Sequence, residues 1–182
     1  MAPAEKISKL SNRSSDRQLV DYVIDNSKSF NSLINTYLEG PYRTTQRLAG
    51  ALTQIATETP SMLKPHFKRI IDALNDPQAS TALKRNTVRM FQFVRIPGNR
   101  QAAVIDICFR YLQDRKETIA VKVFSMSVLE LLTHNHPELR RELLLVLEDE
   151  LPYAGPAFRS RGFKVLKKLN SSPPEKAVRP RV

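Results

Sequence analysis

The sequence predicts an all-α fold in which helical hairpins stack one after another. Only 5 of the 182 residues are glycine, and the apolar residues lack the strict alternation that a half-buried strand requires. Apolar pairs recur instead at a spacing of 36 to 40 residues, each within a segment of apolar i, i+3, i+4 spacing. A repeat of this length is typical of a solenoid, in which neighbouring units cover each other's apolar faces. The recurring pairs are Leu52/Ile55, Met90/Phe93, Met126/Leu129 and Leu166/Leu169.

Each pair lies in the second helix of a predicted hairpin, and a helix over Ser15–Ile24 is expected to cap the N-terminal end. Proline or glycine stands at most of the boundaries, because proline lacks the N–H that a helix interior needs and disfavours α geometry at the residue before it. The predicted first helices cover Phe30–Glu39, Met62–Asn75, Asn99–Gln113 and Pro137–Leu151. The predicted second helices cover 41–59, Ala79–Ile96, Glu117–His134 and Ala157–Asn170.

Both ends of the sequence are polar, and they set the expected domain limits. Residues 1–14 are predicted to be a flexible N-terminus, and residues 15–170 a single domain. Residues 171–182 contain three prolines and few apolar side chains, so we expect a flexible basic tail there.

Composition narrows the class of protein. The one cysteine, Cys108, excludes an intramolecular disulfide and a cysteine-based zinc site. No stretch has the apolar core of a secretion signal or the length of a membrane span, so we expect a cytoplasmic protein without a membrane partner. The formal net charge of +11 makes anionic partners plausible, although lysine and arginine can also form a merely solvated face.

A basic residue ahead of small and apolar residues recurs early in the second helices, as in Arg47–Leu52 and Arg161–Leu166, with Arg85 in the same place before Met90. In the third unit this place is taken by Val121. Helical hairpins of about 38 residues with this pattern resemble HEAT repeats over roughly Phe30–Asn170, and armadillo-like arrays share the same physics. The resemblance implies a right-handed α-α superhelix of about four hairpins, whose second helices line a concave face.

Basic and acidic residues are distributed differently between the first and the second helices of the predicted hairpins. Counted over 41–59, 79–96, 116–135 and 154–170, the second helices hold 13 basic and 3 acidic residues. Counted over 28–40, 61–76, 99–114 and 137–151, the first helices hold 8 basic and 10 acidic residues. A residue five positions before an aligned core position lies about 140° from it around a helix, so the arginines of this pattern are predicted to point away from the core. The expected polyanion-binding residues are Arg43, Arg47, Arg85, Arg89, Arg161, Lys164 and Lys168.

Two functions fit a basic concave face. The first is a non-catalytic scaffold that binds an acidic protein segment. The alternative is sequence-independent binding of nucleic acid, as in the HEAT-like DNA glycosylases that remove alkylated bases. Their cleft uses tryptophan, and this chain has none, so their catalysis ranks last. No phosphate-binding or nucleophile motif occurs, and His134 and His136 stand at a predicted helix end, so we expect no cofactor and no metal.

Overall fold

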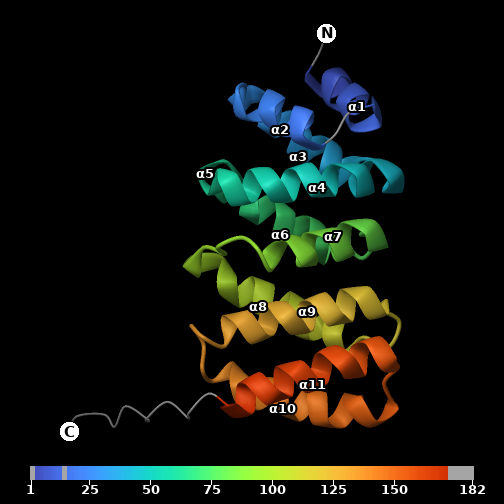
Figure 1. Cartoon of the computed structure of the whole chain (residues 1–182), viewed down its shortest axis with the longest axis vertical. Helices are drawn as coiled ribbons and strands as arrows, with labels where there is room; N and C mark the ends of the chain where they lie inside the picture. Colours follow the sequence, from blue (N-terminus) through green and yellow to red (C-terminus); the bar gives the residue numbers. More distant parts are fainter. Residues whose placement is uncertain (1–2, 14–15, 172–182) are drawn as a thin grey trace, which may run out of the picture. The chain divides into compact units, whose positions relative to one another are not determined.

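The computed structural model describes residues 3–13 and 16–171 (Figure 1). Every regular element in these two ranges is a helix, which confirms the predicted all-α class. The chain divides into two compact units, Met1–Ile107 and Cys108–Val182. None of the described helices combines the length and apolar character needed to cross a membrane.

Unit 1 contains the first seven α-helices, a short 3-10 helix and the start of the eighth α-helix. The elements are α1 Pro3–Arg13, α2 Asp16–Ile24, α3 Ser27–Glu39, α4 Tyr42–Glu58, α5 Pro60–Leu63, η1 Lys64–His66, α6 Phe67–Asn75, α7 Thr81–Phe91 and α8 Gly98–Gln113. The second helices form one layer, because α2 packs on α4 and α4 packs on α7. Helix α3 packs on both α2 and α4, and α4 also contacts α1 and α5.

The N-terminus differs from the prediction of a flexible segment over residues 1–14. Residues 3–13 form α1, which packs against α2, α3 and α4 and buries Ile7 completely. The helix expected as an isolated cap, now α2, is therefore the second member of a hairpin begun by α1. The predicted basic tail, from residue 172 on, lies outside the described residues.

The helix predicted over Met62–Asn75 is broken into three pieces. Pro65 lies within η1, between α5 and α6, where its missing N–H and its ring prevent a continuous α-helix. After this break α6 turns a fully apolar side into the core of unit 1. The buried residues of α6 are Phe67, Ile70, Ile71 and Leu74.

Unit 2 contains the end of α8, then α9 Ile119–Leu132, α10 Leu139–Glu150, η2 Leu151–Tyr153 and α11 Pro156–Ser171. Helix α9 packs on both α10 and α11, and α10 packs on α11 (Figure 1). As its composition predicts, α9 is buried on most sides. Two charged residues, Lys122 and Glu130, are buried with its apolar side chains.

Candidate binding surface

The seven residues predicted to bind a polyanion fall into two groups, one in each unit. Arg43 and Arg47 lie on α4, and Arg85 and Arg89 lie on α7, all within unit 1. The other three, Arg161, Lys164 and Lys168, lie on α11 in unit 2.

The four arginines of unit 1 lie on two helices that pack side by side. Arg43 and Arg47 are exposed and lie one turn apart on α4. Arg89 is exposed on α7, and Arg85, one turn before it, is half-buried. We call these four residues the arginine surface.

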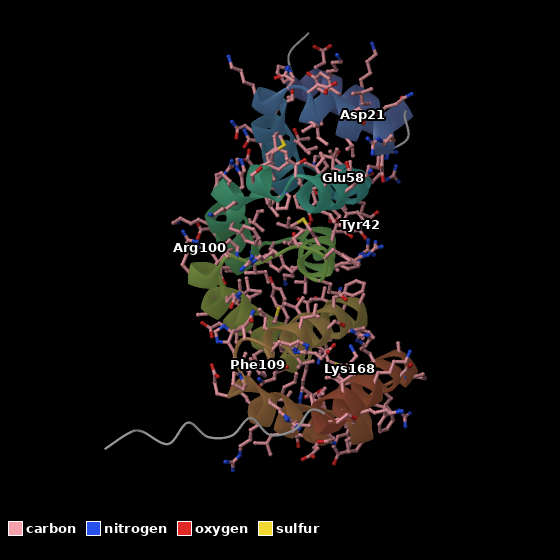
Figure 2. The ribbon with its side chains drawn as sticks, turned by 60° about the vertical axis from the view of Figure 1, so that its left-hand side comes forward. Asp21, Tyr42, Glu58, Arg100, Phe109 and Lys168 are labelled. Atoms are coloured by element: carbon pink, nitrogen blue, oxygen red, sulfur yellow. The ribbon has the colours of Figure 1, made fainter. Side chains whose placement is uncertain are left out.

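Few acids accompany this surface. Helices α4 and α7 together carry five basic residues and one acidic residue, Glu58, at the far end of α4. Glu58 Oε1 accepts hydrogen bonds from Arg17 Nη1 at 3.2 Å and from Gln54 Nε2 at 2.8 Å. Arg17 also pairs with Asp21 at 2.9 Å, so both acids labelled on α2 and α4 in Figure 2 are already paired.

Two of the four guanidinium groups have no acidic partner within the described chain. Arg43 and Arg89 form no ion pair with any side chain described in residues 3–13 and 16–171. Cations without an acidic counter-charge favour an anionic ligand, because such a ligand replaces water and mobile counterions around them.

Arg85 has a different environment. Its Nη2 lies 3.5 Å from Asn86 Oδ1, and its charge acts on the phenol of Tyr37. Burial raises the pKa of Tyr37 well above its ordinary value, while the hydrogen bond to Thr87 and the charge of Arg85 oppose this rise. Arg85 therefore links the arginine surface to the core beneath it.

An exposed aromatic residue that the sequence analysis did not select adjoins the surface. Tyr42 begins α4, directly before Arg43, and its ring is about half exposed (Figure 2). Its hydroxyl accepts a hydrogen bond from Gln46 Nε2 at 3.0 Å, which holds the ring against the helix. Exposed tyrosine is enriched at protein interfaces. The sequence signal for Tyr42 is its position directly after Gly40-Pro41, at the start of a helix.

The basic residues of α11 are not equivalent to those of unit 1. Lys168 Nζ contacts both oxygens of Glu130, at 3.1 and 3.2 Å, and Arg161 Nη2 lies 3.8 Å from Glu130 Oε2. Of the three predicted residues on α11, only Lys164 is exposed without an ion-pair partner in the described chain. Two of the three predicted residues thus already neutralise a buried acid of α9, a partner that periodicity alone cannot identify.

Reactive groups in the described part of the chain are few. No cluster of three or more histidine, cysteine or acidic side chains could hold a metal ion there. His136 lies 3.2 Å from Glu138 through its Nδ1 atom, and His134 is exposed. Cys108 is completely buried, and burial raises the pKa of its thiol to about 12 while a contact with Ser125 opposes the rise. It is therefore a core residue.

Comparison with known proteins identifies a family but no individual relative. No curated protein and no solved structure matches the chain. Residues 4–169 match the HEAT repeat domain family, over a range that begins in α1 and ends in α11. The helical pairs, the layer of second helices and this match together show that the chain belongs to the HEAT repeat domain family.

Proposed function

We propose that this HEAT repeat protein is a scaffold whose arginine surface binds an acidic segment of a partner protein. The observation that carries the proposal is the pairing state of the arginines. Arg43 and Arg89 form no ion pair with an acid of the described chain, whereas Asp21 of α2 and Glu58 of α4 are both held by Arg17. The surface therefore has positive charge available to a ligand.

The size of the surface favours a peptide over a nucleic acid. The sequence predicted a track of seven cations, but Arg161 and Lys168 already interact with Glu130. The arginine surface alone offers four cations on two adjoining helices, together with the half-exposed ring of Tyr42. A short peptide with a few acidic residues and one apolar residue fits such a mixed surface better than a long phosphate backbone does.

Fluorescence anisotropy with two labelled probes tests this proposal. One probe is a ten-residue peptide of aspartate and glutamate with one central phenylalanine, and the other is a duplex DNA of similar length. We expect the peptide to bind, and Arg43→Glu/Arg89→Glu to weaken its binding by about tenfold or more. The matched control is Lys28→Glu/Lys116→Glu, which changes the net charge equally at two exposed sites outside the surface.

The outcomes separate the candidates. Loss of peptide binding in the arginine variant but not in the control supports the proposal. Equal loss in both variants contradicts it, because the effect then reflects net charge only. Binding of the DNA, but not of the peptide, with a steep salt dependence would favour the nucleic-acid alternative and overturn the proposal.

A further inference from the structure

The last described hairpin, α10 and α11, exposes large apolar side chains on the sides of its helices that lie opposite α9. On α11 the side that faces α9 is marked by Lys168 and Arg161, since both reach Glu130 of α9. Phe163 is five residues from Lys168 and two from Arg161, which places it about 140 to 160° from them around the helix. Its side chain is 59% exposed, as expected for a residue opposite α9.

Helix α10 has the same arrangement. Leu143 and Leu147 are completely buried, and Leu145 lies two residues from each, on the opposite side of the helix. Leu145 is 58% exposed, and Tyr153, in the 3-10 helix that follows α10, is 90% exposed. Three large apolar side chains of one hairpin are therefore in contact with water.

The first hairpin provides the contrast. Among the described side chains of α1 and α2, the exposed residues include Glu5, Lys9, Arg17 and Asp21, and no large apolar side chain is exposed. The α10–α11 hairpin, by contrast, exposes three large apolar side chains, which is typical of a surface that another protein covers.

The charges beside the apolar residues indicate which partner fits. Helix α11 carries five basic residues and no acidic residue, while α10 carries four acidic residues and two basic ones. Glu148 and Asp149 are exposed on α10, and Arg159 and Lys167 are exposed on α11. If a two-fold axis places α10 of one copy across α11 of another, opposite charges meet twice and the apolar residues are covered.

We propose that the α10–α11 hairpin is a self-association surface at which two copies of this chain pair symmetrically. Leu145 and Phe163 form the apolar centre of the contact, and the acidic face of α10 meets the basic face of α11 of the second copy. The proposal concerns unit 2 and is independent of the arginine surface in unit 1.

Sedimentation velocity over two decades of protein concentration tests this proposal on the full chain. We expect a monomer–dimer equilibrium, with Leu145→Glu or Phe163→Glu raising the dissociation constant by about tenfold or more. Phe93→Glu is the matched control, because Phe93 is equally exposed but lies in unit 1. All three positions are exposed, and an unchanged circular dichroism spectrum and melting temperature show that a variant is folded.

Variants with exchanged charges distinguish this specific contact from nonspecific association. Glu148→Lys/Asp149→Lys and Arg159→Glu/Lys167→Glu should each weaken the dimer, and an equimolar mixture of the two variants should restore association as a heterodimer. A wild-type chain that stays monomeric at every concentration overturns the proposal. A control variant that dissociates as readily as Phe163→Glu, or a mixture that does not associate, overturns it as well.

Discussion

The ammonium group of Lys168 lies 3.1 Å from Oε1 and 3.2 Å from Oε2 of Glu130, whose side chain is only 5% exposed. Lys168 itself is 61% exposed. The pair therefore joins a buried acid of α9 to a base at the surface of α11. Because the two partners differ in burial, removing one should have a different consequence from removing the other.

The first prediction is that Lys168→Met destabilises the protein more than Glu130→Gln does. Without Lys168, the buried carboxylate keeps only Arg161 at 3.8 Å, and we expect a loss of about 1 to 3 kcal/mol in the free energy of unfolding. Without the carboxylate, Lys168 can be solvated by water, so Glu130→Gln should cost less than about 1 kcal/mol. Urea denaturation measures both values.

Lys164→Met is the control for this comparison, because Lys164 is exposed on the same helix without an ion-pair partner among the described side chains. We expect it to change the free energy of unfolding by less than about 0.5 kcal/mol. Equal effects of Lys164→Met and Lys168→Met would show that the Glu130 pair contributes nothing to stability.

The second prediction concerns the buried hydrogen bond between α3 and α7. The hydroxyls of Tyr37 and Thr87 lie 2.9 Å apart, and both residues are buried. Tyr37→Phe leaves the Thr87 hydroxyl without this partner and should cost about 1 to 2 kcal/mol, as should Thr87→Val. The double variant should cost less than the sum of the two single variants, because it removes both polar groups.

A double-mutant cycle with urea denaturation gives the coupling energy, expected at about 0.5 to 1.5 kcal/mol. Tyr42→Phe is the matched control, since its hydroxyl is at the surface and bonds only within α4. Strictly additive effects of the two core substitutions would mean that the hydroxyls do not interact in solution.

The third prediction follows from the buried thiol of Cys108. Burial raises its pKa from 9.0 to about 12, so the thiol stays protonated in the folded protein at pH 8. A disulfide reagent such as DTNB should therefore react only as fast as the chain opens, and at once in denaturant. Immediate reaction of the folded protein at pH 8 would contradict the burial of Cys108.

The same pKa shift makes the stability of the fold depend on pH in the alkaline range. The folded state holds the proton of Cys108 more tightly than the unfolded state does, so the protonated thiol stabilises the folded state. This stabilisation is complete below pH 9 and is lost as the pH rises towards 12. We expect the free energy of unfolding of Cys108→Ala to fall less between pH 9 and 11 than that of the wild type. Parallel decreases would show that the thiol does not take part.

Much of the fold could be predicted from the spacing of the apolar residues and from the proline and glycine residues at helix boundaries. The exceptions have identifiable causes. The predicted start and end of Asn99–Gln113 agree with α8 to within one residue, because Pro97 and Asp114 bound a clear apolar repeat. Helix α1 was missed, although Ile7 and Leu10 have helical spacing, since two apolar residues in a polar segment indicate a helix only when a neighbour buries them.

The candidate surface was harder to predict, because a count of charged residues does not show which basic side chains pair with acids of neighbouring helices. Arg161 and Arg43 were both predicted to bind a polyanion, yet Arg161 lies beside Glu130 of another helix and Arg43 has no acidic partner in the described chain. Such pairing depends on which helices pack together. The spacing of residues along one helix does not contain that information.

The last prediction compares two glycines that the structure places in opposite surroundings. A methyl group at Gly162 would lie 2.7 Å from Cδ2 of Leu151, within the packing of α11 on η2, whereas a methyl group at Gly98 would meet no atom within 4 Å. Gly98→Ala should raise the free energy of unfolding by about 0.4 to 1 kcal/mol, because alanine has less freedom to lose on folding. Gly162→Ala gains the same helix preference, but Leu151 is buried and must move, at a cost of about 1 to 3 kcal/mol. We therefore expect a net loss of stability for Gly162→Ala and a gain for Gly98→Ala in thermal denaturation. If Gly162→Ala were as stabilising as Gly98→Ala, the close approach of α11 to Leu151 would be wrong.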